Sequence, residues 1–548
     1  WALQMPADQI GSLPEQTQVA TASYSVIFTK YFKSLVIVAL GSFCFIFGSS
    51  VIQSWGQSIL GSAYKFSPAM VAILFMVVSL GDLLGRLSSA WLGDRIGRKR
   101  VMLVYGLVGA LGLLICWRAV NLGWRPNNRR LFLTGSVLSI ATSLVPPLTS
   151  ADVLMYAAYG RIQMLGLNPY DITPAEIFRQ EFDPLLIITE RPWQDTPSVY
   201  GPLASASQWL AAYLGGGNMH NTVFWLQMFA LLPFLLIGAL VVRMAHDDHR
   251  TQTRAVLFTV LNPLMIWSVL AGAHNEAFTL VFAIVGLYFM RRSSFVAGLG
   301  IGLAGTVKVS LVFYGIAMAW GYRRDWRKLV GLALGAAIPL VIAYGFIVPR
   351  ALLAAGRNTG YISAGSWAPW LQWAMGWVIG DWAARGVIGW LGWVLMVIVA
   401  WMLSRVLPWR LAPGVSSTLD PRRDPLTVAV RTAAILTTAW LVTSPYTLSW
   451  YDLITWVPLG LMAATRLDVL MIWRGMWLSI AYVTGRSVEF SPTMQSVSAF
   501  VRDWLCTGAQ WVVLIAIVHW WWTTSQRFPS LPAWVPRPGR GRLEAAPH

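Results

Sequence analysis

The chain has 548 residues, of which 56% are hydrophobic and only 12% charged. Soluble domains carry roughly a quarter charged residues, so this composition excludes a soluble globular protein. The charge is basic, with 41 Lys and Arg against 23 Asp and Glu, and in so apolar a chain this excess is typical of cytoplasmic loops rather than of nucleic-acid binding.

The numbers of tryptophan and cysteine residues give further information on the class of protein. The 31 Trp residues exceed ordinary usage, and indole rings favour the interface between membrane and water. Cys44, Cys116 and Cys506 lie far apart, which indicates neither a disulfide framework nor a metal site. Residues 1–30 are polar, so we expect no cleavable signal peptide there.

Apolar stretches of about membrane-spanning length recur along the chain and predict an all-α polytopic membrane protein with about 12 to 14 membrane segments. Such long runs differ from the alternating strands of a membrane β-barrel, which we exclude. The stretches are 33–52, 67–93, 101–117, 131–149, 222–243, 255–271, 277–290, 295–321, 329–349, 386–404, 427–443, 451–465, 469–483 and 509–523.

The placement of Lys and Arg predicts how these segments are oriented, because short cytoplasmic loops are enriched in both. Basic clusters occur at 243–254, 291–292, 323–328, 405–431 and 466–474. If these are cytoplasmic, the segments on the outer side are 150–221, 271–276, 350–385, 444–450 and 484–508.

Two stretches conflict with a single crossing. The first, 295–321, has basic residues on both sides and is interrupted by Gly305 and Lys308. We expect two half-helices that enter and leave on the cytoplasmic side, which is tolerated only where protein or a cavity surrounds the broken backbone. The second, 101–117, also has basic residues on both sides, and both flanks cannot be cytoplasmic if it spans once.

These patterns divide the chain into five regions. They are a cytoplasmic N-terminal tail (1–30), N-terminal membrane helices (31–149), a large extracytoplasmic catalytic loop with juxtamembrane helices (150–221), a C-terminal membrane helix bundle (222–523) and a flexible cytoplasmic tail (524–548).

The segment 150–221 is polar and far longer than a typical connection, and long loops in compact proteins are usually functional. The spacing of Asp152, Tyr156, Tyr159 and Gln163 places them on one face of a helix. Asp152 fits two compatible roles, a general base acting on a hydroxyl group or a cap of the helix that follows.

Two further pieces of this segment carry aromatic side chains. Asn168 and Tyr170 belong to a turn around an Asn-Pro pair. Trp193 and Tyr200 lie in a Pro- and Gly-containing stretch, 193–202, and their rings offer stacking surfaces for a sugar. An interfacial aromatic belt explains the same composition equally well.

Three residues form a polar triplet between two apolar stretches: His274, Asn275 and Glu276. Ionisable groups at membrane depth are costly and indicate a function. One His and one Glu two positions apart are a weak ligand set, so we predict no metal site. Lys308, inside an apolar run, fits either a phosphate contact or a side chain that snorkels to the nearer interface.

Aromatic residues gather again at 444–452, where Tyr446 and Trp450 accompany a carboxylate. Five Trp residues between 367 and 382 recur at helix-like spacing and predict an amphipathic interfacial helix. No Walker loop, dinucleotide glycine fingerprint or Ser-His-Asp arrangement is legible in the sequence, so nothing supports nucleotide-dependent chemistry.

Several of these motifs together resemble one family. The sequence resembles the actinobacterial polyprenol-phosphate-mannose-dependent α-(1→6)-mannosyltransferases that build lipomannan, members of the GT-C superfamily. The resemblance rests on four motifs in order, which are Asp152–Arg161, Leu167–Tyr170, Thr196–Leu203 and Ala271–Ala277. The segment 444–451 adds a fifth motif, which the resemblance places late in the chain and on the outer side.

The resemblance implies an inverting transfer of mannose on the outer face of the plasma membrane, from a polyprenyl-phosphate-mannose donor to a glycolipid mannan acceptor of lipomannan and lipoarabinomannan. Asp152 matches the family's catalytic Asp and becomes the candidate general base. Arg161 is the first candidate partner of the donor phosphate and Lys308 the second. Substrate contacts are expected from Tyr156, Tyr159, Asn168, Tyr170, Trp193, Tyr200, His274, Asn275, Glu276, Tyr446 and Trp450.

The leaving group is already a phosphate, so the sequence requires no cofactor, and a divalent cation is unsupported. Membrane lipids are expected partners, nucleic acid is not, and the sequence indicates no oligomeric state. A second hypothesis, a major-facilitator-type secondary transporter, comes from 67–104, which resembles the second helix and following loop of such transporters. The latter half holds no second copy of its Gly93–Arg98 motif.

Overall fold

The computed structural model describes residues 98–147, 149–190, 193–351, 360–410, 419–484 and 492–527. The chain divides into two compact units, 1–98 and 99–548, and the first lies almost wholly outside the described residues. The predicted N-terminal tail, the stretches 33–52 and 67–93 and most of the C-terminal tail also lie outside them.

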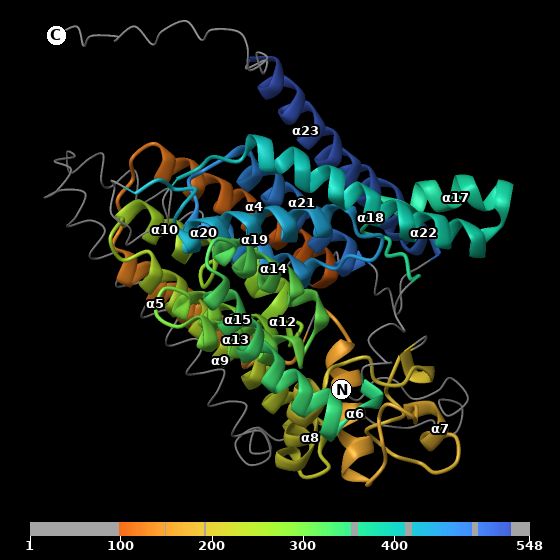
Figure 1. Cartoon of the computed structure of the whole chain (residues 1–548). Coiled ribbons are helices and arrows are strands. Elements are labelled where there is room, and N and C mark those ends of the chain that lie inside the picture. Colours follow the sequence, from red (N-terminus) through yellow and green to blue (C-terminus); the bar gives the residue numbers. More distant parts are fainter. Residues whose placement is uncertain are drawn as a thin grey trace, which may run out of the picture. The chain divides into compact units, whose positions relative to one another are not determined.

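The described residues form helices and no strand, which confirms the all-α prediction (Figure 1). The helices are α4 (Arg98–Asn121), α5 (Asn128–Ser143), α6 (Asp152–Met164), α7 (Pro174–Phe178), α8 (Pro202–Gly215), α9 (Met219–Met244), α10 (His249–Phe258), α11 (Pro263–Met265), α12 (Glu276–Phe289), α13 (Ser294–Gly305), α14 (Val312–Tyr322), α15 (Trp326–Leu340), α17 (Ala368–Ile379), α18 (Asp381–Val406), α19 (Pro425–Thr443), α20 (Leu453–Leu461), α21 (Arg466–Thr484), α22 (Pro492–Phe500) and α23 (Cys506–Arg527).

Short 3₁₀ and π turns extend or join these helices. They are η2 (Trp193–Asp195), η3 (Ile266–Leu270), η4 (Val309–Leu311), η5 (Val341–Ile347), η6 (Ser449–Asp452) and η7 (Val501–Leu505).

Six described helical segments are long and apolar enough to cross a membrane, which confirms a polytopic membrane protein. Two of them form the middle of the bundle, because 83% of an 18-residue apolar window is buried in both His249–Leu270 and Pro425–Thr443. Two others lie at its edge, since only 17% of such a window is buried in Trp326–Ile347 and 28% in Asp381–Val406. The exposed apolar faces of these edge helices are suited to contact with lipid. The predicted total of 12 to 14 segments and the GT-C topology stay predictions.

The three consecutive apolar helices α12, α13 and α14 are too short to cross the roughly 30 Å hydrocarbon layer. At 1.5 Å per residue, the 14 residues of α12 span about 21 Å and the 12 residues of α13 about 18 Å. The break predicted near Gly305 and Lys308 is confirmed, because α13 ends at Gly305 and α14 follows after η4. Glu276 and Lys308 therefore stand at helix ends inside the protein.

Contacts between loops define two ends of the bundle. At the first, called the basic end, Arg250 donates to Asn121, Asn128 donates to Gln252, and Arg410 pairs with Asp248.

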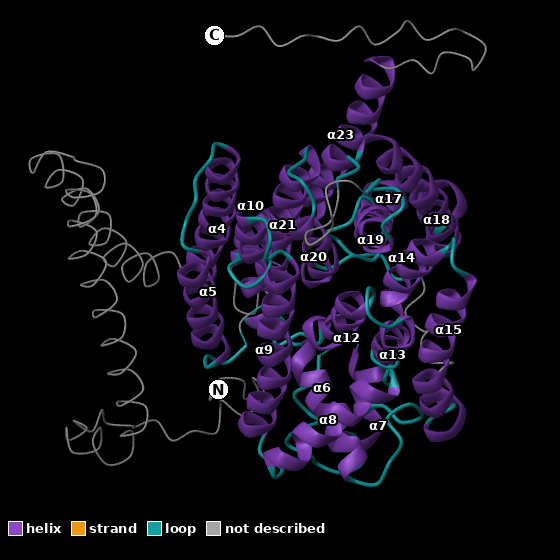
Figure 2. Ribbon diagram, turned by 60° about the vertical axis from the view of Figure 1, so that its left-hand side comes forward, coloured by secondary structure: helices purple, strands orange, loops and turns teal. Residues whose placement is uncertain are grey.

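At the opposite, cavity end, the Gln227 amide donates to the Val145 carbonyl, and the Thr149 amide donates to Ala271. The helix α5 therefore runs from the basic end to the cavity end. The basic residues of 118–130 therefore lie at the same end of the bundle as the basic cluster 243–254. Of the two basic flanks of 101–117, this places the one that follows it at the basic end. Figure 2 shows α6, α7 and α8 gathered together beneath α12 and α13 and beside the lower part of α9.

Two arginines that the sequence assigns to cytoplasmic clusters are buried instead. Arg254 pairs with Asp468, and Arg474 pairs with Asp452, all with side chains at most 3% exposed. The pattern of Lys and Arg in the sequence could not distinguish these two arginines from exposed loop arginines, because their carboxylate partners are 214 and 22 residues away in the chain.

The predicted Trp-rich interfacial helix is present as α17. The Trp373 and Trp377 rings are 62% and 80% exposed, as an interfacial anchor requires. Trp367 differs, because it is buried and its indole N–H donates to the Thr443 carbonyl.

Candidate active site

A cavity of about 740 Å³ opens at the cavity end of the bundle. One wall consists of α6 and the segment 193–201, and the facing wall consists of 360–362, α18 and 440–451. Its volume lies in the range of small-molecule sites, which is roughly 300–1,000 Å³. The predicted site residues that line it are Asp152, Tyr156, Tyr159, Trp193, Tyr200, Lys308, Tyr446 and Trp450.

The helix α6 places Asp152 at the edge of this cavity. Asp152 is the first residue of α6, and its backbone N–H donates to the Ser150 hydroxyl over 3.1 Å. The cap position belongs to Ala151, so capping does not occupy the Asp152 carboxylate. A negative charge in the first turn also interacts favourably with the helix dipole. Tyr156 and Tyr159 follow along the same face, as the spacing predicted.

Behind Asp152 lies a buried histidine from a distant part of the chain. The Nδ1 atom of His274 is 3.6 Å from Oδ2 of Asp152, and the His274 ring is fully buried. It stacks on the Trp450 indole with ring centroids 3.5 Å apart and an interplanar angle of 16°. The motifs around 152, 274 and 450 therefore meet at one place, with His274 between Asp152 and Trp450.

The backbone before His274 adopts an unusual conformation that directs this ring. Ala273 has a φ of 52°, the left-handed region that residues with a side chain rarely adopt. A Cβ atom on Gly272 would lie 2.5 Å from the His274 ring, so only glycine fits there. Such strain persists where the surrounding structure enforces it and is concentrated at functional sites.

Lys308 reaches the cavity from the turn between α13 and η4. Its ammonium group pairs with the carboxylate of Glu276 at the start of α12, and it lies 4.6 Å from the centre of the Tyr451 ring. The Glu276 side chain is 3% exposed and that of Lys308 is 22% exposed. Two basic side chains thus line the cavity in the described part of the chain: Lys308, which is backed by a buried carboxylate, and Arg385 of α18, which pairs with the more exposed Asp381.

Tyrosine side chains form most of the remaining polar wall. The rings of Tyr156 and Tyr200 meet edge to face at 5.2 Å, and the Tyr159 hydroxyl donates to the Thr196 carbonyl. Burial raises the pKa of Tyr156 and of Tyr200 well above the usual value, and the charge of Asp152 raises both further. These phenols therefore stay neutral at physiological pH and retain an O–H that can donate to a substrate oxygen.

The other predicted contacts lie outside the cavity lining. Arg161 points to the far side of α6, where its Nε donates to Asp183 over 2.8 Å. Asn168 stabilises its own turn, because its amide donates to Asp171 and its side-chain oxygen accepts from the Tyr170 N–H.

Tyr170 and the polar triplet form a supporting layer. The Tyr170 hydroxyl donates to the Tyr200 carbonyl, and burial raises the pKa of Tyr170 to about 12. His274 and Glu276 support Asp152 and Lys308, while the Asn275 side-chain amide is enclosed without a hydrogen-bond partner in the described part of the chain.

Several residues of the site are missing from the sequence-based prediction. Tyr361 contacts Trp193 at 5.3 Å between ring centroids, and Tyr451 lies under Lys308. Gly386 and Gly389 line the cavity on the α18 side and have open space beside them, since a Cβ atom on either would meet nothing within 4 Å. Tyr451 lies within the motif 444–451 but was not chosen as a site residue, whereas Tyr361 and the two glycines carry no local signal.

A buried polar network holds the segment 444–450 in place. Arg474 donates to Asp452, to Gln510 and to the Thr447 hydroxyl, and its side chain is 1% exposed. The Thr447 backbone N–H donates in turn to Ser363. Arg474 is thus a supporting residue that sequence reasoning missed, although an arginine within the apolar run 469–483 is itself a signal.

The fold and the cavity define a class, a polytopic helical membrane protein with a polar and aromatic site at one end. Residues 58–324 match a protein-family model described as "Alpha-(1->6)-mannopyranosyltransferase, N-terminal domain". Over this region the chain is similar to the alpha-(1->6)-mannopyranosyltransferase family, in agreement with the motifs. The matched region contains Asp152, His274 and Lys308.

Curated relatives carry names of the same kind. A probable alpha-(1->6)-mannopyranosyltransferase of Mycolicibacterium smegmatis is 28% identical over 280 residues, 48% of each chain. Alpha-(1->6)-mannopyranosyltransferase B of Corynebacterium glutamicum is 25% identical over 240 residues, 40% of each chain. Alpha-(1->6)-mannopyranosyltransferase A of Mycobacterium tuberculosis is 26% identical over 287 residues, 47% of this chain and 53% of its own. The matches thus span about half the length of these relatives. No solved structure gives a significant match.

Proposed function

We propose that this protein transfers mannose from a polyprenyl-phosphate-mannose donor to an α-(1→6)-mannan acceptor of the lipomannan type. The observation that carries the proposal is the cavity that brings Asp152 and Lys308 to one site within the region matching the family. A carboxylate base and a cation are the two groups that transfer from a sugar phosphate needs most.

Asp152 is the base in this proposal. Its carboxylate takes the proton of the acceptor 6-hydroxyl as that oxygen attacks the anomeric carbon of the donor mannose. The new glycosidic C–O bond forms while the bond between the anomeric carbon and the phosphate oxygen breaks. Attack from the face opposite the leaving group inverts the anomeric configuration.

The leaving group is polyprenyl phosphate, which departs with the bonding electrons. Lys308 lines the cavity and Arg161 does not, so Lys308 takes the phosphate role for which Arg161 was the first candidate; Arg385 also lines the cavity but is more exposed and pairs with Asp381. Neutral Tyr156 and Tyr200 supply O–H donors, and the Trp193 ring supplies a stacking surface for a sugar. Because a phosphate leaves as a stable anion, the scheme needs no metal ion.

The proposed setting is the outer face of the plasma membrane, with the lipid donor and the glycolipid acceptor reaching the cavity from that side. The basic end carries the Arg-rich loops and would face the cytoplasm, since short cytoplasmic loops are enriched in Lys and Arg. The transporter hypothesis is not favoured, because the family match begins at residue 58 and includes the transporter-like stretch 67–104.

The test is mannose transfer from polyprenyl-phosphate mannose to a short α-(1→6)-mannoside by membranes that carry wild type or Asp152→Asn. The substitution preserves the shape of the side chain and removes the base, so transfer should fall by about 100-fold or more at unchanged expression. Full activity of Asp152→Asn would overturn the base assignment. No transfer by wild type, under conditions in which a relative is active, would overturn the proposed reaction.

A further inference from the structure

A second cavity lies at the basic end, remote in the fold from the proposed active site. It measures about 800 Å³, is open to the surface, and is lined by the C-terminal part of α4, the start of α10, the end of α18, the start of α21 and α23. This basic-end pocket shares no lining residue with the cavity that contains Asp152. The proposed reaction gives it no role.

The charged side chains that line the basic-end pocket are all basic. Arg118, Arg250 and Arg466 contribute guanidinium groups from three different helices, and no Asp or Glu is among the lining residues. Arg250 is held by the Asn121 side-chain oxygen over 2.8 Å, and none of the three arginines forms an ion pair with a side chain in the described ranges. Three such groups around one pocket attract an anion.

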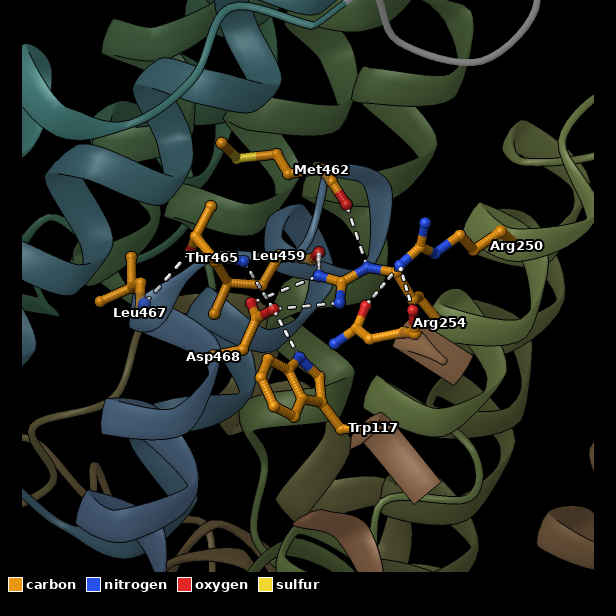
Figure 3. A network of polar contacts seen from close by, with 9 residues as sticks. Trp117, Arg250, Arg254, Leu459, Met462, Thr465, Leu467 and Asp468 are labelled. Carbon is orange, nitrogen blue, oxygen red and sulfur yellow. Dashed lines mark hydrogen bonds and ion pairs between the residues drawn. The ribbon is translucent and has the colours of Figure 1, made fainter. Parts of the chain in front are cut away.

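The nearest buried carboxylate is already committed to other partners, as Figure 3 shows. Asp468 accepts from Arg254 over 3.0 Å, from the Trp117 indole N–H over 2.9 Å and from the Thr465 backbone N–H over 3.1 Å. Its side chain is 0% exposed. Asp468 therefore fixes α4 against α21 and is not among the residues that line the pocket beside the three arginines.

The remainder of the pocket is apolar and aromatic. Leu470 and Val406 line it together with the indoles of Trp117 and Trp520. A free phosphate ion would gain nothing from such a surface, whereas a phospholipid offers both an anionic head group and acyl chains. Basic pockets between membrane helices on the cytoplasmic side are typical sites for anionic lipid head groups.

We propose that the basic-end pocket binds an anionic phospholipid, with the head-group phosphate among Arg118, Arg250 and Arg466 and the acyl chains against Leu470 and Trp520. The ligand class is a membrane lipid with a phosphodiester anion. The site is separate from the one that would take the sugar donor, so the proposal stands whether or not the chain transfers mannose.

The experiment titrates the full chain, purified in a zwitterionic detergent, with phosphatidylglycerol or phosphatidylcholine and counts bound lipids by native mass spectrometry. The pocket variant is R118Q/R250Q/R466Q. The matched control, R129Q/R324Q/R327Q, removes the same three charges from residues that do not line the pocket. Size-exclusion profiles and thermal unfolding establish that both variants are folded.

Wild type and the control variant should retain phosphatidylglycerol at a stoichiometry near one, and phosphatidylcholine should not bind. The pocket variant should bind phosphatidylglycerol at least about tenfold more weakly, since each basic residue near an anionic lipid is worth about a factor of five. Equal weakening in both variants would overturn the proposal, because it would mean nonspecific attraction. Displacement of the lipid by millimolar inorganic phosphate alone would also overturn it in favour of a free-phosphate site.

Discussion

At the scale of single residues, the structure assigns His274 a role that the sequence left open. The ring lies 3.6 Å from Asp152, stacks on Trp450 and follows a strained Ala273. These contacts restrict where the Asp152 carboxylate can lie. A positioning residue of this kind affects the chemical step more than substrate binding.

We therefore expect His274→Ala to lower kcat for mannose transfer by about 10- to 100-fold with little change in KM. His274→Asn should recover part of the loss, because its amide can contact Asp152 from near the Nδ1 position. Both variants lose the stack on Trp450, so equal losses would mean that His274 acts only through packing. His246→Ala is the control, since that side chain is 50% exposed at the basic end.

Lys308 and Glu276 allow stability to be separated from catalysis. Lys308→Met leaves the Glu276 carboxylate buried without its cation, so we expect lower thermal stability and a loss of transfer. The cost should be smaller than the roughly 3–5 kcal/mol of breaking a fully buried pair, because Lys308 is 22% exposed.

The double variant Glu276→Gln with Lys308→Met removes both charges and should unfold near the wild-type temperature. Its transfer activity should nevertheless stay low, because the cation that faces the donor phosphate is missing. Thermal unfolding and the transfer assay on the same preparations measure the two effects. Wild-type activity of the double variant would remove Lys308 from the mechanism.

At the scale of elements, a glycine explains how the motif 196–203 positions Lys308. The Gly201 N–H donates to Val307, and a Cβ atom on Gly201 would lie 2.2 Å from the Thr306 carbonyl oxygen. The segment before α8 therefore packs directly against the turn that ends at Lys308. The φ of Gly201 is −70°, so this close approach, and not the backbone conformation, requires glycine.

Gly201→Ala should push this turn away, destabilise the protein by about 1–3 kcal/mol and reduce mannose transfer. Gly112→Ala is the matched control, because a Cβ atom there meets nothing within 4 Å, and it should leave both properties nearly unchanged. Thermal unfolding and the transfer assay provide the comparison. An unaffected Gly201→Ala enzyme would show that the contact with Thr306 does not hold Lys308 in place.

The elements themselves were largely predictable, whereas their partners were not. Hydropathy located the long helices because lipid requires continuous apolar helix, and the break at Lys308 was visible as a charge within an apolar run. The sequence placed Arg161 before Lys308 as a phosphate partner, whereas in the structure Lys308 lines the cavity and Arg161 does not. The contact of Arg161 with Asp183 depends on the fold of the loop 165–190, and the depth of Lys308 depends on the short helix α13.

At the scale of the whole molecule, short helices and buried ion pairs act together. The helix α12 begins at Glu276 and α13 ends just before Lys308, so the buried Glu276 supports Lys308 at the cavity, while Arg474 with Asp452 supports the segment 444–450. Buried ion pairs contribute little net stability but strongly disfavour arrangements that separate the partners. Each buried pair thus fixes one part of the cavity lining: Glu276 fixes Lys308, and Arg474 fixes the segment 444–450.

The sidedness of this arrangement can be measured with two introduced cysteines in a chain whose three native cysteines are replaced by Ala and which retains transfer activity. Gln180 lies in the loop between α6 and α8, His246 lies between α9 and α10, and both are exposed. If the Arg-rich loops are cytoplasmic, a membrane-impermeant maleimide should label Gln180→Cys in intact cells and His246→Cys only after permeabilisation. The opposite pattern would place Asp152 on the cytoplasmic side, since α9 connects the two loops in one crossing. That result would require a donor presented from inside the cell and would overturn the proposed setting of the reaction.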